Sequence, residues 1–190
     1  MGSEMCIRDS LDDPYHHVKL PFNVDLSGVA SQTFIAGNSG SGLTTALMAL
    51  VSSLNVRYRQ GYVHTILMDF AGAALLNMQN LPNVIGACTA TEIDKVKRYL
   101  GEVNRVMVYR EKMMGEMRAN TIEEYFENRT AEQYALDPYG HIVIALDNFN
   151  RAFEAAKEEA DDFTGYPEWW AMLERTNSRG QQTGVHFVAT

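Results

Sequence analysis

The stretch "GNSGSGLTT" at residues 37–45 decides how the rest of this chain is interpreted. It has the spacing of a phosphate-binding loop, in which Gly, four residues and a second Gly precede Lys and then Ser or Thr. Gly37, Gly42 and Thr44 occupy the expected positions, whereas Leu43 stands where the pattern has lysine. The loop therefore predicts a phosphate site that lacks its usual side-chain cation.

The residues around the loop have the order that such a site requires. The apolar run QTFIAG (32–37) predicts a buried strand that ends in the loop, and LTTALMALVSSL (43–54) predicts the helix after it. Glycines let backbone N–H groups turn toward a phosphate, and the helix adds the positive end of its dipole. Thr44 would then ligate Mg²⁺ and Thr45 would donate to the α-phosphate of ATP. The nucleotide-binding candidates are Gly37, Asn38, Ser39, Gly40, Ser41, Gly42, Leu43, Thr44 and Thr45.

The leucine at position 43 predicts a larger defect in hydrolysis than in binding. Lysine normally reaches the β- and γ-phosphate oxygens, and loss of one preorganised transition-state donor costs about 10²–10³ in rate. A charged hydrogen bond contributes about 1.5–3 kcal/mol to binding, and the backbone donors and Mg²⁺ would remain. The alternative is a Gly/Ser-rich turn between strand and helix that holds no ligand.

A second strand end completes the predicted site. The apolar run HIVIALD (141–147) has the pattern of a Walker B strand, and its terminal Asp147 would hold Mg²⁺ opposite Thr44. Many ATPases place Glu after this Asp to polarise the attacking water, but here Asn148 follows, and an amide cannot take a proton. Asp147 and Asn148 are the candidate catalytic positions, and Thr44 and Asp147 are the candidate Mg²⁺ ligands. The alternative for Asp147 is a cap of the next turn.

Four apolar runs with little alternation of polarity set the expected fold class. They cover residues 32–37, 62–70, 141–147 and 183–190, and helix-forming segments separate them. Strands of this kind are buried on both faces of a sheet, so we expect an α/β fold with a mainly parallel sheet and helices on both sides. Residues 71–90 are expected to form a short helix and turns, and Thr89 and Glu92 a capping box for the next helix.

Composition and charge exclude several classes of protein. The chain has 190 residues, of which 46% are hydrophobic and 21% charged, as in a soluble globular domain. Its net charge of −8, without a Lys/Arg cluster longer than two residues, makes nucleic acid an unfavoured partner. Cys6 and Cys88 form neither a CxxC pair nor a disulfide framework, which fits a reducing compartment. No apolar run is long enough to span a membrane.

Both ends of the chain differ from what a complete domain would show. The leader "MGSEMCIRDS" (1–10) does not continue into the pattern that follows, and we interpret it as non-native or as a disordered terminus, outside the fold. The chain stops at GVHFVAT (184–190), inside a predicted strand. We therefore expect residues 11–190 to be a partial domain, truncated at both ends.

Five stretches share their order and spacing with one family. They are LPFNVDLSGVASQTFIAGNSGSGLTT (20–45), LMDFAGAALLNMQNLPNVIG (67–86), VYREKM (108–113), IVIALDNF (142–149) and RGQQTGVHFVAT (179–190). Together they resemble a FtsK/SpoIIIE-type P-loop ATPase domain, and more closely a C-terminal, degenerate ATPase module of the type VII secretion motor EccC/EssC. The second stretch distinguishes this family from other P-loop proteins. The resemblance implies a RecA-like fold.

The resemblance also implies a function and a set of partners. Modules of this kind stand in tandem with other ATPase modules of the same chain, with a hexamer as one assembly, on a motor that exports small helical proteins. The motor lies at the cytoplasmic face of a bacterial plasma membrane, and only other parts of the full-length protein would contact the membrane. Degenerate modules are thought to bind ATP with Mg²⁺ and substrate signal sequences rather than to power transport, so Leu43 and Asn148 put hydrolysis in doubt.

An arginine finger from a neighbouring module is a further implication of the resemblance. Arg110, Arg175 and Arg179 are the candidates, and a surface charge is the alternative for each. Two other functions stay open. A DNA translocase would need a lysine at position 43, a glutamate at 148 and a basic surface, whereas a protein-interaction module with a vestigial nucleotide pocket would need none of these.

A few other side chains have two interpretations. Asp69 ends a predicted strand and either faces the nucleotide or caps a turn. Trp169 and Trp170 either pack in a helix or mark a partner surface. The strand histidines are interpreted as structural; they are His64, His141 and His186.

Overall fold

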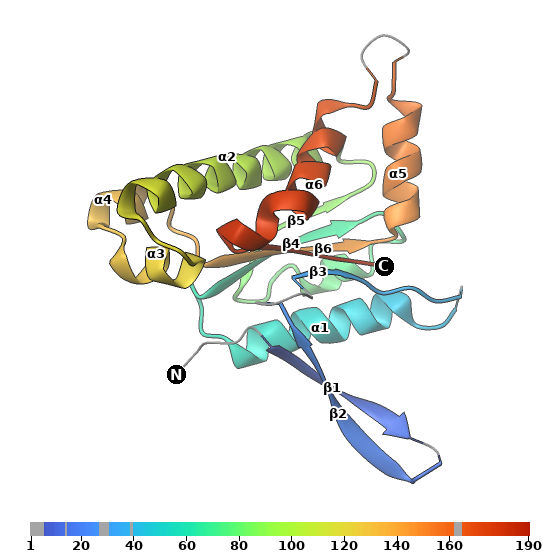
Figure 1. Cartoon of the computed structure of the whole chain (residues 1–190). Coiled ribbons are helices and arrows are strands. Elements are labelled where there is room, and N and C mark those ends of the chain that lie inside the picture. The colour runs from blue at the N-terminus through green and yellow to red at the C-terminus, as the bar shows by residue number, and fades with distance from the viewer. Residues whose placement is uncertain (1–5, 14, 27–30, 39, 162–164) are drawn as a thin grey trace.

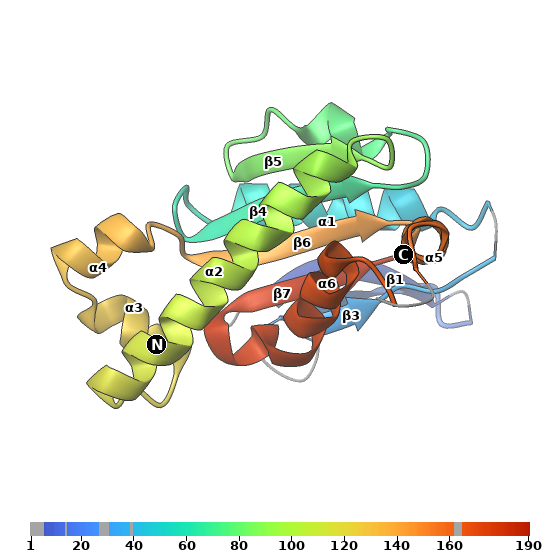
Figure 2. The ribbon, with the colours of Figure 1, turned by 90° about the horizontal axis from the view of Figure 1, so that it is seen from above.

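A five-stranded parallel sheet, in the order β3-β7-β6-β4-β5, forms the centre of the molecule. The computed structural model describes residues 6–13, 15–26, 31–38, 40–161 and 165–190. The strands of the sheet are β3 (Gln32–Phe34), β4 (Val63–Asp69), β5 (Val84–Thr89), β6 (His141–Asp147) and β7 (Val185–Ala189). Figure 2 shows them side by side in that order. The predicted α/β class with a parallel sheet is confirmed.

Helices cover both faces of the sheet (Figure 1). One face packs against α1 (Leu43–Arg57) and the short 3-10 helix η1 (Leu75–Met78). The other face packs against α2 (Ile93–Met117), α5 (Phe149–Glu158) and α6 (Glu168–Arg179). The remaining helices are α3 (Ile122–Asn128), α4 (Ala131–Leu136) and the 3-10 helix η2 (Gly180–Thr183), which leads into β7. None of the described helices is both long enough and apolar enough to cross a membrane.

Successive residues of the central strand β6 point to opposite layers. Ile142, Ile144 and Leu146 pack with the layer of α2, α5 and α6, whereas Val143 and Ala145 pack with α1. This alternation is the two-residue period of an extended strand. Because both faces are covered, both sets are buried, and β6 reads in the sequence as one continuous apolar run.

The order of the strands brings three strand ends together. From β3, at one edge of the sheet, the chain crosses through α1 to β4, and it returns later to form β6 and β7. Strand β7 lies between β3 and β6 and pairs with both. The loop after β3 therefore lies beside the carboxyl ends of β6 and β7, the position at which ligands bind in open α/β sheets.

Strand β5 is the main element of the sheet that the sequence did not predict. Residues 71–90 were expected to hold only a short helix and turns; the helix is η1, but β5 follows it and pairs with β4 at the sheet edge. Its six residues are mostly half-buried or exposed, so they form no apolar run. The α2 helix begins at Ile93, and the Glu92 carboxylate accepts a hydrogen bond from Thr89 N at 3.2 Å, which is one half of the predicted capping box.

A two-stranded antiparallel ribbon precedes the sheet. It consists of β1 (Cys6–Asp13) and β2 (Val18–Asp25), and it extends away from the α1 side of the sheet in Figure 1. The sequence did not predict these two strands. Residues 6–10 of the expected leader belong to β1, whereas residues 1–5 lie outside the described part of the chain.

The tryptophan pair lies inside the helical layer. Trp169 and Trp170 are buried on α6, and the ring of Trp169 stacks on Phe70 with centroids 6.4 Å apart. Each indole N–H has a carboxylate acceptor, Glu159 for Trp169 and Glu174 for Trp170. The packing role is confirmed, because rings this deeply buried cannot form a partner surface.

Candidate functional site

The loop between β3 and α1 depends on glycine conformations. Gly40 and Gly42 have φ angles of 80° and 86°, in the left-handed region that glycine enters without steric penalty. Ser41 N donates a hydrogen bond to Asn38 O at 3.0 Å, which closes a turn within the loop. Gly42 is the N-cap of α1, whose first turn has no side-chain cap and no acidic residue. The first N–H groups of this described helix therefore remain available to an anion. Ser39 lies outside the described residues.

Gly37 and Leu43 approach each other across the base of the loop. A Cβ atom added to Gly37 would lie 2.6 Å from Ser41 Oγ and 3.2 Å from Leu43 Cδ2. A larger residue at position 37 would therefore require the Ser41 and Leu43 side chains to move. The leucine side chain folds back on the loop and brings no positive charge to it.

Thr44, Asp147 and Thr190 form one hydrogen-bonded group. Thr44 Oγ1 donates to Asp147 Oδ2 at 2.8 Å, and Thr190 Oγ1 donates to Asp147 Oδ1 at 2.6 Å. The structure thus brings together the two residues that the sequence assigned to Mg²⁺. Thr190 was not predicted from the sequence, although it is, like Asp147, a polar residue at the carboxyl end of a predicted strand.

Asn148 is engaged in local structure at the start of α5. Its φ of 66° lies in the left-handed region, which Asn adopts more readily than most side chains. Its backbone N donates to Thr190 Oγ1 at 3.0 Å, and its side-chain Oδ1 accepts from Arg151 N at 3.1 Å as the cap of α5. The amide is therefore held as a helix cap at the position where other ATPases carry a catalytic carboxylate.

An open cavity of about 550 Å³ lies between the loop and these strand ends. Its described lining residues are Asn38, Gly40, Gly42, Leu43, Thr44, Ala71, Asp147, Asn148, Asn150 and Thr190. Asp147 is the only charged side chain among them, so an anion would meet backbone N–H groups, hydroxyls and amides, but no side-chain cation. Ala71 and Asn150 were not singled out from the sequence. Thr45 is exposed on α1 and does not line the cavity, so its contact with an α-phosphate stays a prediction.

Asp69 has the turn role rather than the nucleotide-facing one. It is buried beside Asp147 in the register of β4 and β6. Its carboxylate accepts hydrogen bonds from the backbone N–H groups of Ala71 at 2.9 Å, Gly72 at 3.0 Å and Leu75 at 2.8 Å. These contacts fix the turn after β4 and the start of η1, and they use both carboxylate oxygens.

Arg110 is neither an arginine finger nor a surface charge, which corrects both sequence interpretations. It is fully buried, and its guanidinium donates to the Asp137 carboxylate at 2.7 and 3.0 Å. The guanidinium also donates to the carbonyl oxygens of Thr183, Tyr139 and Gly140. A side chain held in this way joins α2 to the amino ends of β6 and β7 and cannot reach another subunit.

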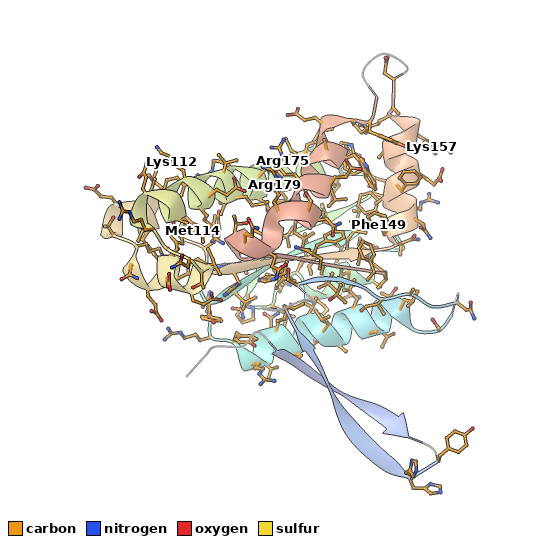
Figure 3. The ribbon with its side chains drawn as sticks, viewed as in Figure 1. Lys112, Met114, Phe149, Lys157, Arg175 and Arg179 are labelled. Carbon is orange, nitrogen blue, oxygen red and sulfur yellow. The ribbon has the colours of Figure 1, made fainter. Side chains whose placement is uncertain are left out.

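Arg175 and Arg179 are exposed on α6 (Figure 3). They line a groove against Met107 and Val108 of α2, on the face of the sheet opposite α1. From this face they do not line the cavity of their own chain. A role as an arginine finger toward a neighbouring module stays a prediction.

The fold and the site define a class of protein. A glycine loop that joins an edge strand to α1, and a strand-end aspartate bonded to the first threonine of that helix, are the features of a P-loop ATPase fold. The FtsK/SpoIIIE family profile matches residues 14–190. The chain therefore belongs to the FtsK/SpoIIIE family.

Its curated relatives are ATPase proteins of ESX secretion systems. The chain is 28% identical over 181 residues to the ESX-1 secretion system protein EccCb1 of Mycobacterium tuberculosis, a match that covers 94% of this chain and 29% of that protein. It is 29% identical over 178 residues to the ESX secretion system protein EccC of Thermomonospora curvata, covering 94% and 13%. The chain thus spans less than a third of these relatives. The resemblance to EccC modules is confirmed.

Solved structures support the fold. EccC of Thermomonospora curvata (ATPases 2 and 3), in complex with a signal sequence peptide, superposes with a TM-score of 0.83 at 24% identity, over 98% of this chain and 32% of that one. The conjugation coupling protein TcpA, solved with ATPγS, superposes with a TM-score of 0.70 at 17% identity, over 100% and 48%. At these identities the likeness shows the P-loop ATPase fold.

Proposed function

We propose that this chain is a nucleotide-binding but catalytically degenerate ATPase module of a type VII secretion motor, with a regulatory or substrate-recognition role in protein export. The observation that carries the proposal is the bond between Thr44 and Asp147 beside the cavity, in a chain whose lysine position holds Leu43. The relatives are ESX secretion proteins, which supports the assignment to an export motor rather than to a DNA translocase.

Binding of Mg²⁺ and ATP is supported by the groups that line the cavity. Thr44 and Asp147 would hold the metal ion, since their oxygens are 2.8 Å apart and hydroxyl and carboxylate oxygens are the ligands that Mg²⁺ takes. The uncapped first turn of α1 would meet the phosphates. Mg²⁺ would supply the positive charge that position 43 lacks and would polarise the phosphate oxygens.

Slow or absent hydrolysis is supported at two positions. Leu43 supplies no donor for the charge that develops on the γ-phosphate, and such a donor contributes about 10²–10³ in rate. Asn148 cannot accept the proton of an attacking water, and its side-chain oxygen already caps α5. The nucleotide would then act as a bound regulator, because its contacts survive while the groups that split it do not.

The partners follow from the relatives and belong to the same proposal. Neighbouring ATPase modules of one longer chain would pack against this one, with a hexamer as one assembly, at the cytoplasmic face of a bacterial plasma membrane. The exported substrates would be small helical proteins. Figure 3 marks the exposed Arg175 and Arg179 of the α2–α6 groove, which offer a charged surface for a neighbouring module.

The test is a titration of a fluorescent ATP analogue with Mg²⁺ against the chain. We expect saturable binding that weakens at least about tenfold in Thr44→Ala and Asp147→Ala, because each removes a metal contact worth more than 1.4 kcal/mol. Ser52→Ala, an exposed serine further along α1, is the matched control and should bind as the wild type does.

The opposite result is equally informative. Absence of binding would mean that the cavity is vestigial and that the function lies on a protein-binding surface. A signal peptide from a secreted partner, titrated with and without ATP, then tests the regulatory part. Equal peptide affinity in both conditions would contradict recognition controlled by nucleotide.

A further inference from the structure

A cavity of about 530 Å³ lies at the amino edge of the central sheet, where α3 and α4 are found in Figure 1. Its described lining residues are Arg59, Gln60, Gly61, Tyr62, Phe126, Glu127, Arg129, Tyr134 and Gly140. None of them lines the phosphate-loop cavity. Two are arginines and three are aromatic, so this cavity offers positive charge beside flat apolar surface.

The guanidinium of Arg129 is held in one orientation. Its Nη1 donates hydrogen bonds to Asp137 O at 2.7 Å and to Tyr139 O at 2.8 Å, which uses both N–H groups of that nitrogen. The rings of Phe126 and Tyr134 lie 5.0 and 4.7 Å from its Cζ, measured to the ring centroids. Stacking of this kind uses the faces of the guanidinium and leaves the N–H groups in its plane available.

The other edge of the same guanidinium has no hydrogen-bond acceptor. Nε and Nη2 of Arg129 form no hydrogen bond with the residues that the structure describes, although the side chain is only 10% exposed. The N–H groups of these two nitrogens form a fork that matches the two oxygens of a carboxylate. Because a buried donor without an acceptor costs free energy, this edge favours an anionic ligand.

The charges around Arg129 also leave an excess of positive charge. The Asp137 carboxylate is bound by Arg110 at 2.7 and 3.0 Å, and its Oδ2 lies 3.8 Å from Nη1 of Arg129. In the described part of the chain, neither guanidinium forms an ion pair with another carboxylate. One negative charge therefore faces two positive charges. Arg59 adds an exposed cation to the cavity wall, and the exposed Glu127 pairs with neither arginine of that wall.

We propose that Arg129 and Arg59 bind the carboxylate of an organic acid in this cavity, with an aromatic or other flat apolar group of the ligand against the rings of Tyr62, Phe126 and Tyr134. A guanidinium fork also fits phosphate. The aromatic wall favours the organic acid, because inorganic phosphate has no apolar surface to bury against it. A small free acid and the last residue of another polypeptide chain share this chemistry. The site is independent of the phosphate loop and goes beyond the proposed function.

The experiment is an NMR titration of the ¹⁵N-labelled chain with N-acetylphenylalanine, without nucleotide or Mg²⁺. N-acetylphenylalanine amide has the same ring and lacks the charge, so it is the matched control ligand. Arg59→Gln removes the exposed cation of the cavity wall. Arg57→Gln makes the same change of charge at an exposed position two residues earlier that does not line the cavity, and it is the matched control variant.

We expect the ¹⁵Nε resonance of Arg129 to shift saturably with the acid, which identifies the ligand-binding side chain without a substitution. The amide should bind at least about tenfold more weakly, because it cannot accept the charged pair of hydrogen bonds. Arg59→Gln should weaken binding of the acid about three- to fivefold, as expected for an exposed charge, and Arg57→Gln should bind as the wild type does.

Phenylacetate distinguishes the two sources of the carboxylate, since it has the ring and the charge without the amide of a chain end. Tighter binding of N-acetylphenylalanine would support a chain end, and tighter binding of phenylacetate would support a free acid. Equal affinity for N-acetylphenylalanine and its amide, or an unchanged Arg129 resonance, would overturn the proposal. Inorganic phosphate that binds as tightly as the acid would also overturn it, and equal affinities in the two arginine variants would refute the assignment of Arg59.

Discussion

An aspartate lies at each edge of the central sheet: Asp147 at the carboxyl ends of the strands and Asp137 near their amino ends. The two carboxylates have different hydrogen-bond donors. At the carboxyl edge, Asp147 lies beside an open cavity and accepts hydrogen bonds from the hydroxyls of Thr44 and Thr190. At the amino edge, Asp137 is fully buried and is bound by both ends of the Arg110 guanidinium. Neutral hydroxyls leave the charge of Asp147 uncompensated for a metal ion, whereas the guanidinium neutralises Asp137. The first arrangement suits a ligand site and the second supports the fold.

The largest expected effect is at the amino edge. Arg110→Met removes the guanidinium and leaves the buried Asp137 carboxylate with only the Tyr125 hydroxyl, at 3.1 Å, and the Arg129 guanidinium, at 3.8 Å, beside it. The loss should cost about 3–5 kcal/mol in the free energy of unfolding. Urea denaturation measures the loss. Arg105→Gln, which breaks the exposed pair with Glu102, is the control and should cost less than about 1 kcal/mol. Similar losses for the two variants would contradict the contrast between a buried and an exposed ion pair.

The next effect is at the carboxyl edge and concerns turnover. Leu43→Lys should make the free energy of ATP binding more favourable by about 1.5–3 kcal/mol, because it restores a charged hydrogen bond to phosphate. Turnover should stay slow in that variant and rise about 10²-fold further only when Asn148→Glu is added, since a base is then present. Single-turnover hydrolysis with both variants measures this. Full turnover in Leu43→Lys alone would show that position 148 is not limiting.

Asn148→Glu is also expected to lower the stability of the fold. The residue has a φ of 66°, and a side chain without the special tolerance of Asn costs about 1–2 kcal/mol there. The amide cap of α5 is lost as well. The stability of the double variant should therefore be measured beside its activity, so that partial unfolding is not mistaken for a missing base.

The buried histidines at the amino edge of the sheet should make the stability of the fold depend on pH. His141 and His186 have folded-state pKa values lowered to about 3 and about 4, whereas an unfolded histidine titrates near 6.5. The unfolded chain therefore binds more protons below about pH 6.5, and the stability present above that pH is lost as pH falls toward the folded values. Between pH 7.5 and 5 we expect a loss of about 2 kcal/mol for each histidine. Urea midpoints that do not change over this range would contradict the buried neutral pair.

The smallest expected effect is the difference in affinity between ATP and ADP. The described residues that line the phosphate-loop cavity include no lysine, arginine or histidine, so the γ-phosphate gains no side-chain cation. We expect the two dissociation constants in Mg²⁺ to differ by less than about threefold, which is below 1 kcal/mol. Competitive displacement of a fluorescent nucleotide measures both. If ATP instead bound more than about tenfold more tightly than ADP, a cation from outside this cavity would have to contact the γ-phosphate.

The sequence predicted the carboxyl edge better than the amino edge, for a physical reason. Thr44 and Asp147 belong to segments whose local pattern, a glycine loop and an apolar strand, fixes where their side chains lie. Arg110 lies on a long helix, where the sequence alone predicts that an arginine is exposed on the surface. Its partner Asp137 is 27 residues further on, in a connection without a pattern, so the buried pair depends on tertiary packing.

Two other features of the structure also depend on tertiary packing and could not be predicted from local sequence patterns. The strand β5 was missed because it is an edge strand with one residue, Ile85, 44% exposed, and such strands form no apolar run. The buried histidine pair could not be predicted either. The sequence shows a histidine in each of two strands, but only the packing brings His141 Nδ1 to 3.0 Å from His186 Nε2 and leaves the other nitrogen of each ring without a partner among the described residues.

The turn at Asn148 links the floor of the cavity to the packing of the opposite helical layer. Phe149, which is labelled in Figure 3, follows it directly. Its ring centroid lies 5.2 Å from that of Phe34, 5.5 Å from that of Trp170 and 6.3 Å from that of Phe187. The turn beside Asp147 is therefore continuous with an aromatic cluster to which two strands, β3 and β7, and two helices, α5 and α6, contribute. Any change in the backbone of this turn would therefore reach the aromatic cluster directly, because Phe149 is the next residue in the chain.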